Sequence, residues 1–228
     1  MPSDAAHARG ILSSRPGVKD KSVSPGQGTR PIGFGQERDG LLHVPASLDP
    51  HRPAPLVIML HGAGASAHDV MPIVSSCADE HAVLVLAPDS RETTWDLIQH
   101  DYGPDVAFLE RALEDVFRTY AVDPERIAIA GFSDGASYAL SLGLVNGALF
   151  SDILAFSPGF AAPSQTEDEP RIFISHGRQD PVLPIERCGE RVAAALKQSG
   201  YDVDYREFSG GHVVPTEMVE AAFRRFLS

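Results

Sequence analysis

Two periods alternate in the hydrophobic pattern of this chain. Short, mainly apolar segments of strand length predict strands at 56–60, 82–86, 126–130, 153–156, 171–175 and 203–208. In the stretches between them, apolar residues recur at the spacing of a helix face, which predicts helices at about 66–80, 105–120, 135–144, 184–199 and 215–226. Strands that alternate with helices are typical of an α/β fold, so we expect a mostly parallel, doubly wound sheet flanked by helices.

The beginning of the chain follows neither period. Residues 1–30 are rich in Pro, Gly, Ser and Lys, which predicts an irregular N-terminal arm. Residues 31–228 are expected to form one α/β domain, because a domain of this class can reach that length without dividing. Near the start of this domain, the Asp39-Gly40 pair suggests a hairpin turn that leads into a strand at 41–44.

A short motif follows the strand predicted at 126–130. Residues 131–135 read Gly-Phe-Ser-Asp-Gly and fit the pattern G-x-S-x-G. Between a strand and a helix, this pattern is typical of a nucleophile elbow, in which a strained turn raises the serine hydroxyl above the sheet. The alternative is a glycine-rich turn with a solvated serine. Ser133 is therefore a candidate nucleophile whose assignment depends on the rest of the chain.

A serine hydroxyl needs a base to take its proton, and the base needs a carboxylate to orient it. Elbow-type hydrolases carry these residues in the order serine, acid, histidine. Asp180 follows the strand at 171–175, and His212 follows the last predicted strand. The candidate triad Ser133, Asp180 and His212 thus falls at carboxyl ends of strands, where open α/β sheets bind ligands. His176 is the other histidine after Ser133, but no later acid and histidine fit it, so a structural role is favoured.

An ester hydrolase also needs backbone N–H groups that stabilise the developing oxyanion. One is expected from Asp134, directly after the candidate nucleophile. The loop after the strand at 56–60 reads His-Gly-Ala-Gly, and Ala63 is the first choice for the second donor. Its neighbour Gly62 is expected to let the substrate approach, and His61 to anchor the loop. The alternative is a tight turn in which the glycines serve only to reverse the chain.

Taken together, these motifs resemble the α/β-hydrolase superfamily, and within it the phospholipase/carboxylesterase branch near acyl-protein thioesterases and dienelactone hydrolases. The resemblance rests on His61-Gly62-Ala63-Gly64, Gly131-Phe132-Ser133-Asp134-Gly135, His176-Gly177-Arg178-Gln179-Asp180 and Gly211-His212. It covers about residues 50–228. It implies a single-domain α/β-hydrolase fold, and it implies the same three residues as the triad. Dienelactone hydrolases usually carry cysteine as nucleophile, so the serine at this position disfavours their chemistry.

Two aromatic residues are candidates for the substrate cleft. Trp95, the one tryptophan, follows the carboxyl end of a predicted strand, and similar esterases have a cleft-lining aromatic residue near this place. A core position is the alternative for Trp95. Phe160 lies between the strands at 153–156 and 171–175 and is expected to form the opposite wall. This connection is too short for a cap domain, so the site is expected to be open.

Charge and composition narrow the partners. The net charge of −12 disfavours nucleic acid and other polyanions, acyl-CoA among them, and favours small to medium neutral esters. No metal-ligand spacing or phosphate-binding loop occurs, so no metal or cofactor is expected. No apolar run is long enough to span a bilayer, and nothing indicates a homo-oligomer. Cys77 and Cys188 are expected to be buried thiols, which favours a cytoplasmic protein.

The sequence therefore predicts a serine carboxylesterase that works through an acyl-enzyme. A second hypothesis is an acyl-protein thioesterase or lysophospholipase-type hydrolase, because an open site would admit such substrates. A third, from a different class, is a catalytically silent binding module on the same fold.

Overall fold

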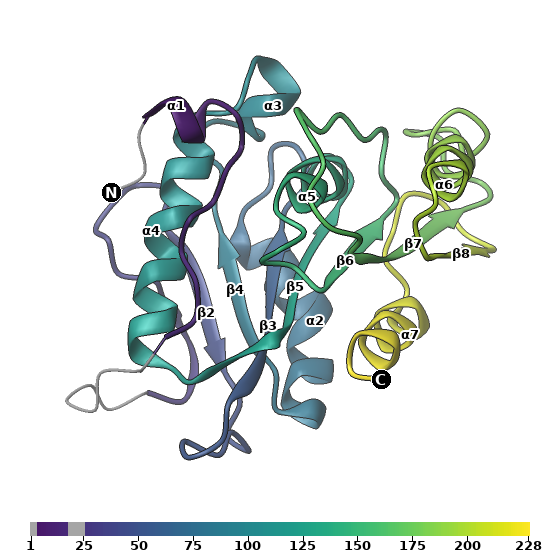
Figure 1. Cartoon of the computed structure of the whole chain (residues 1–228). Coiled ribbons are helices and arrows are strands. Elements are labelled where there is room, and N and C mark those ends of the chain that lie inside the picture. The colour runs from purple at the N-terminus through teal and green to yellow at the C-terminus, as the bar shows by residue number, and fades with distance from the viewer. Residues whose placement is uncertain (1–3, 18–25) are drawn as a thin grey trace.

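The computed structural model describes residues 4–17 and 26–228, and these residues form an eight-stranded sheet with helices on both faces (Figure 1). The strands lie in the order β1-β2-β4-β3-β5-β6-β7-β8. β2 pairs antiparallel with β1 and β4, and all other neighbours are parallel. The strands are β1 (Gly28–Pro31), β2 (Gly40–Val44), β3 (Ala54–Leu60), β4 (Leu84–Pro88), β5 (Val122–Phe132), β6 (Asp152–Phe156), β7 (Arg171–Gly177) and β8 (Val203–Phe208). The expected mostly parallel α/β sheet without a cap domain is confirmed.

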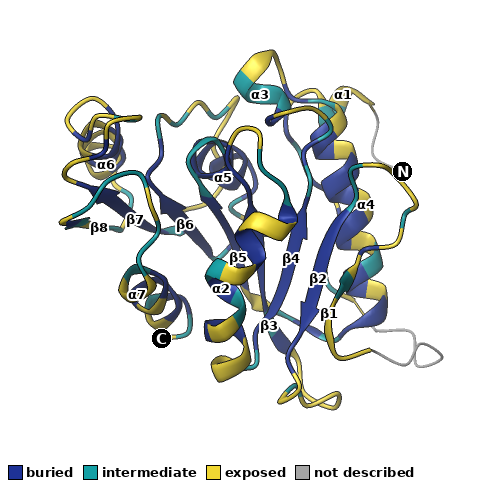
Figure 2. Ribbon diagram, turned by 180° about the vertical axis from the view of Figure 1, so that it is seen from behind, coloured by how far each residue is buried: buried dark blue, intermediate teal, exposed yellow. Residues whose placement is uncertain are grey.

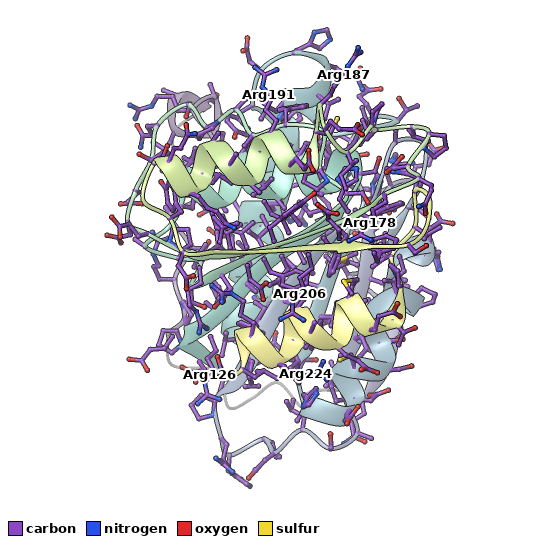
Figure 3. The ribbon with its side chains drawn as sticks, turned by 90° about the vertical axis from the view of Figure 1, so that its right-hand side faces the viewer. Arg126, Arg178, Arg187, Arg191, Arg206 and Arg224 are labelled. Atoms are coloured by element: carbon purple, nitrogen blue, oxygen red, sulfur yellow. The ribbon has the colours of Figure 1, made fainter. Side chains whose placement is uncertain are left out.

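Helices cover the two faces of the sheet in separate layers. The longer ones are α2 (Ala67–His81), α4 (Pro104–Thr119), α5 (Asp134–Val145), α6 (Gly189–Gln198) and α7 (Thr216–Phe226), and the short ones are α1 (Asp4–His7) and α3 (Asp96–Gln99). One hydrophobic cluster joins α4, α5 and α6 to the sheet, and the other joins α2 and α7. Figure 3 views the sheet nearly edge-on and shows α6 above it and α7 below it. Among the described residues, no helix is long and apolar enough to cross a membrane.

Alternation along the central strand β3 divides the core between the two faces. Leu56, Ile58 and Leu60 belong to the cluster under α4 and α5, whereas Val57 and Met59 belong to the cluster under α2. All five side chains are buried, since successive strand residues point to opposite faces and both faces are covered. In Figure 2 the central strands are accordingly dark blue, while the helices show one buried and one exposed side.

The parallel arrangement gathers several loops at one edge of the sheet. β3, β5, β6 and β7 run in the same direction as β8, so all five strands end at that edge. The loops that carry Gly62, Ser133, Ser157, Asp180 and His212 begin there. This edge is where the candidate site lies.

The structure differs from the predicted elements at several boundaries. β4 begins at Leu84, two residues late, because Ala82 ends α2 in a left-handed conformation with φ of 54°. α6 begins at Gly189, whereas residues 184–188 form a turn closed by Arg187 N–H and Cys188 N–H on Pro184 O. The short helices α1 and α3 were not predicted, because four residues are too few to establish a helical period.

The hairpin near the start of the domain has a longer connection than its two-residue signal suggested. β1 and β2 are joined by residues 32–39, and Gly40 is the first residue of β2. The Asp39 carboxylate accepts the N–H groups of Gly33 and Phe34 at 2.8 and 3.0 Å and so closes the loop from its far end. Asp39-Gly40 therefore ends the connection and is not its centre.

The N-terminal arm packs on the helices of one face. Leu12 is buried in the core, and its N–H donates to Asn146 Oδ1 at 2.8 Å, while Asn146 Nδ2 donates to Gly10 O at 2.7 Å. The Ser13 hydroxyl and N–H both donate to Glu110 of α4. The expected boundary after residue 30 falls inside β1. Residues 1–3 and 18–25 of the arm lie outside the described residues.

Candidate active site

Ser133 lies on a strained turn between β5 and α5. Its φ of 58° and ψ of −119° are unfavourable for a residue with a side chain, typically by about 1–3 kcal/mol. The flanking glycines make the turn sterically feasible: a Cβ on Gly131 would lie 2.2 Å from Gly135 O, and one on Gly135 would lie 2.3 Å from Leu60 O. The motif 131–135 thus has the geometry of a nucleophile elbow.

The structure brings Ser133, His212 and Asp180 into one hydrogen-bonded chain. His212 Nε2 lies 2.8 Å from Ser133 Oγ, and His212 Nδ1 lies 2.6 Å from Asp180 Oδ2. The Asp180 side chain is completely buried, whereas Ser133 and His212 are half-buried at the edge of the sheet. All three candidates chosen from the sequence therefore meet, although they come from three separate loops.

Asp180 is held as an anion that orients His212. Its Oδ1 accepts the N–H groups of Val182 and Leu183, each at 2.9 Å. Burial alone would raise the pKa of Asp180, but hydrogen bonds from Leu183 N–H and His212 outweigh burial and hold the pKa below its usual value. An ionised Asp180 accepts the Nδ1–H of His212, which leaves the Nε2 lone pair facing the Ser133 hydroxyl. The ring centres of Phe132 and His212 lie 4.7 Å apart, so Phe132 packs against the imidazole and restricts the rotation of His212.

His176 lies beside Asp180 and Leu183 and does not reach Ser133. Its side chain is fully buried, with Nε2 2.8 Å from Leu183 O and 3.3 Å from Asp180 Oδ2. Its ring packs against Gly189, where a Cβ would come within 2.4 Å of Nδ1. This close packing favours glycine at the first residue of α6. His176 thus occupies the structural position that the sequence favoured.

Two backbone N–H groups beside Ser133 are free to donate. In the loop after β3, Gly64 N–H donates to Thr93 O and Ala65 N–H donates to Gly62 O. Within the described parts of the chain, the N–H groups of Ala63 and Asp134 have no acceptor. Gly62 brings this loop close to the elbow, since a Cβ there would lie 3.3 Å from Ser133 Cβ. The two predicted oxyanion donors are therefore both available to a substrate oxygen.

His61 anchors the loop that carries Ala63. Its Nδ1 donates to Gly62 O at 2.7 Å, and its Nε2 accepts Ser90 N–H at 2.9 Å, which fixes the tautomer. The ring is completely buried, and burial lowers the pKa of His61. The neutral ring therefore keeps one donor and one acceptor in place.

Trp95 does not line the cleft, contrary to the expectation from similar esterases. Its side chain is 0% exposed and stacks on Tyr138 with ring centres 5.1 Å apart. Its Nε1 donates to His61 O at 2.8 Å, so the indole supports the oxyanion loop from the interior. The physical reason is that an indole gains most by burying its large ring where its N–H also finds an acceptor. The sequence had left this core position open as the alternative.

Phe160 lies on the connector after β6, at the edge of the sheet that carries the candidate triad, and is 37% exposed. The connector that carries it is fixed by Ser137 of α5, whose hydroxyl accepts Gly159 N–H at 2.9 Å and Phe160 N–H at 3.4 Å. Ser141, one turn further along α5, accepts Ala162 N–H at 2.9 Å. The sequence reasoning missed these serines. Their signal was a four-residue spacing of polar residues on an otherwise apolar helix.

Exposed apolar side chains occur on the three loops that follow β6, β7 and β8. Among the described residues, the exposed large hydrophobic side chains are Phe160, Val182 and Val213. Val182 follows Asp180 by two residues, and Val213 follows His212 directly. The rim of the site is therefore apolar, which suits the hydrocarbon part of an ester. Within the same described residues, no three His, Cys, Asp or Glu side chains gather in a way that could hold a metal ion.

Two carboxylates, the buried Asp105 and the half-buried Asp96, hold the loop that leads to Trp95 and to α4. Asp105 accepts Arg91 N–H at 2.6 Å and Asp96 N–H at 2.7 Å. Asp96 in turn accepts the N–H groups of Gly103 and Asp105 at 2.8 and 2.9 Å. Burial, and next the charge of Asp96, raise the pKa of Asp105 to about 6. Nearby, Thr94 Oγ1 donates to Asp134 Oδ2 at 2.7 Å and ties this loop to the elbow.

The raised pKa of Asp105 predicts a pH-dependent contribution to stability. Because the folded state holds the proton more tightly than the unfolded state, this contribution is present below about pH 4 and is lost as the pH rises through about 6. The loss is on the order of 3 kcal/mol. We expect Asp105→Asn to remove it, so that the difference in unfolding free energy between variant and wild type shifts in favour of the variant from pH 4 to 8. Urea unfolding at several pH values measures this, with Asp115→Asn on the same helix as control. A constant difference across that range would contradict the assignment.

Comparison with known proteins agrees with this geometry. The sequence profile of the phospholipase/carboxylesterase family matches residues 107–228, which include all three members of the candidate triad. The chain shares 38% identity over 117 residues with acyl-protein thioesterase 1 of Gibberella zeae, covering 46% of this chain and 49% of that protein. It shares 27% identity over 176 residues with feruloyl esterase C of Emericella nidulans, covering 72% of this chain and 64% of that protein. The chain thus matches about half to two thirds of the length of these relatives.

Solved structures agree on the fold. A CE1 ferulic acid esterase from Anaeromyces mucronatus superposes with a TM-score of 0.65 at 17% identity, and the match covers 92% of each chain. The sheet order and the elbow at its carboxyl edge define an α/β-hydrolase of the serine type. Within that class, this chain belongs to the phospholipase/carboxylesterase family.

Proposed function

We propose that this protein is a serine carboxylesterase that hydrolyses carboxylic esters through an acyl-enzyme. The observation that carries the proposal is the chain from Ser133 Oγ through His212 to a buried Asp180, with distances of 2.8 and 2.6 Å. The free N–H groups of Ala63 and Asp134 beside Ser133 add a place for the oxyanion.

The reaction follows from this geometry. His212 Nε2 takes the Ser133 proton as Oγ attacks the ester carbonyl, and the Ala63 and Asp134 N–H groups stabilise the negative oxygen. Asp180 holds the Nδ1 proton and stabilises the imidazolium. His212 then gives its proton to the leaving alcohol, and an acyl group remains on Ser133. A water molecule repeats the sequence, so that its hydroxyl joins the acyl group and Ser133 regains its proton.

The surroundings of Ser133 favour small to medium neutral esters. The apolar rim suits hydrocarbon groups, and the absence of a cap over the described residues leaves the site open. Asp134 lies beside the reaction centre, and the chain carries a net charge of −12, so a polyanion such as acyl-CoA is disfavoured there. Cys77 and Cys188 are buried free thiols, so a reducing compartment, the cytoplasm, remains our proposed location.

An acyl-protein thioesterase or lysophospholipase-type activity is the second candidate. It is favoured by the 38% identity with acyl-protein thioesterase 1 over the half of the chain that contains the triad candidates. An open site admits a protein or lipid substrate as readily as a small ester. A catalytically silent binding module, the candidate from another class, would not require the complete chain of hydrogen bonds from Ser133 to Asp180.

Labelling with a fluorophosphonate probe tests the proposal. We expect the folded wild-type protein to be labelled stoichiometrically, because the probe reacts with a serine activated by a base. Turnover of p-nitrophenyl butyrate is expected in the same preparation, and prior labelling should abolish it. Folded protein that neither reacts with the probe nor hydrolyses esters would favour the binding module. Turnover of S-acylated peptides well above that of matched oxygen esters would favour the thioesterase.

A further inference from the structure

A groove of about 660 Å³ lies between α6 and the connector 157–170. The apolar side chains of its walls include Phe160, Val192 and Leu196. A volume of this size is typical of sites for small organic ligands. No member of the candidate triad lines the groove, so it is separate from the reaction centre.

One wall of the groove nevertheless lies close to the candidate active site. Gly159 and Phe160 line its near end, and their N–H groups donate to Ser137 Oγ, one helical turn after Ser133. A Cβ on Gly159 would lie 3.5 Å from Leu183, the residue whose N–H donates to Asp180. Gly159 thus connects the groove wall with the helix that follows Ser133 and with the loop that holds Asp180.

Two arginines that line this groove have no side-chain partner among the described residues. Arg187 and Arg191 are four residues apart, and Figure 3 labels both along the top of α6. Neither guanidinium makes a hydrogen bond or an ion pair with another side chain in the described part of the chain. The acidic neighbours Glu186 and Glu190 do not line the groove; they add to the effect of burial in raising the pKa of Tyr205 on β8.

The position of these arginines is not explained by the stability of α6. Arg187 lies just before the helix and Arg191 lies in its first turn, where the positive end of the helix dipole disfavours cations. Like charges four residues apart also repel each other. An anion bound between them would reverse both effects, and the guanidinium group is well suited to a carboxylate.

We propose that the groove binds a carboxylate carried by the substrate, so that the protein also hydrolyses esters whose acyl group ends in a negative charge. The ester carbonyl lies at Ser133, the hydrocarbon chain passes Phe160, and the carboxylate meets Arg187 and Arg191. This inference rests on the proposed esterase function and extends it. The preference for neutral groups applies beside Asp134, whereas the groove lies beyond the reaction centre.

Half-esters of dicarboxylic acids test the proposal. The p-nitrophenyl half-esters of adipic, suberic and sebacic acid are compared with the same compounds whose free carboxylate is blocked as a methyl ester. We expect wild type to favour the free carboxylate in kcat/KM by about tenfold at one or more of these lengths, mainly through KM. The double variant Arg187→Gln/Arg191→Gln should lose that preference and keep its kcat/KM on the blocked esters. The variant Arg187→Glu/Arg191→Glu should reverse it.

Matched controls separate the groove from general charge effects. Lys197→Gln removes a positive charge from α6 outside the groove lining, and Arg224→Gln removes one from α7 across the sheet (Figure 3). Both should keep the preference for the free carboxylate. An equal kcat/KM ratio in wild type and all variants, or the same loss in Lys197→Gln, would overturn the groove assignment while hydrolysis of the blocked esters continues to support the esterase. No turnover of either ester by folded wild type would overturn the proposed function itself.

Discussion

Replacing Ser133 by alanine is expected to lower kcat for p-nitrophenyl butyrate by at least about 10⁴-fold. The hydroxyl that lies 2.8 Å from His212 Nε2 is the nucleophile of the proposed mechanism, and no acyl-enzyme can form without it. Fluorophosphonate labelling should disappear in the same variant. The fold should be unchanged, because alanine keeps the Cβ that packs against Gly62 and removes no backbone contact.

Ser137→Ala is the matched control for this variant. It removes a hydroxyl one turn later on the same helix, which holds the connector through Gly159 and Phe160 but does not touch His212. Loss of these hydrogen bonds should change activity by no more than about tenfold, with full labelling retained. Circular dichroism and urea unfolding confirm that both variants fold. Turnover by Ser133→Ala above one hundredth of the wild-type rate would show that another residue is the nucleophile.

The core and the candidate triad could be predicted from the sequence for a common physical reason. Buried strands are recognised in the sequence as apolar runs, and parallel strands end at the same edge of the sheet. A motif that follows such a strand can therefore be placed near another one without knowledge of the contacts between them. This is why Ser133 and His212, which are 79 residues apart, could be paired before any distance was known.

Trp95 shows where this reasoning ends. Its position after a strand placed it at the correct edge of the sheet, but position along the chain does not tell which way a side chain points. The Trp95 side chain is held in the interior by the His61 carbonyl and the Tyr138 ring, both of which come from other segments. The start of α6 escaped prediction for the same reason, since the close contact between Gly189 and His176 is tertiary.

The charged side chains that line the groove beside α6 are positive, whereas the net charge of the whole chain is negative. A charge of −12 describes the field of the whole chain at long range, and it predicts only that an average anion is repelled. Screening limits such fields to about 8–10 Å at physiological ionic strength. Within that range, the lining of the groove includes Arg187 and Arg191 and no acidic side chain, so overall composition and the proposed local specificity need not agree.

Asp180→Asn is expected to lower kcat by about 10⁴-fold while leaving the protein folded. An amide at this position can still accept the N–H groups of Val182 and Leu183 through its oxygen. Its NH₂ group would then face His212 Nδ1, which must become an acceptor. The imidazole proton moves to Nε2 and points at the Ser133 hydroxyl, so His212 can no longer act as base.

Asp204→Asn on β8 supplies the control, because this half-buried carboxylate pairs with the exposed Arg206 and has no contact with His212. It should retain wild-type kcat within about threefold, since exposed ion pairs contribute little. The assignment of roles predicts a further distinction between variants. Asp180→Asn should still bind substrate with a KM near that of wild type, because the change affects the tautomer of the base and not the apolar rim. A kcat within tenfold of wild type would mean that Asp180 does not orient His212, whatever the distance between them.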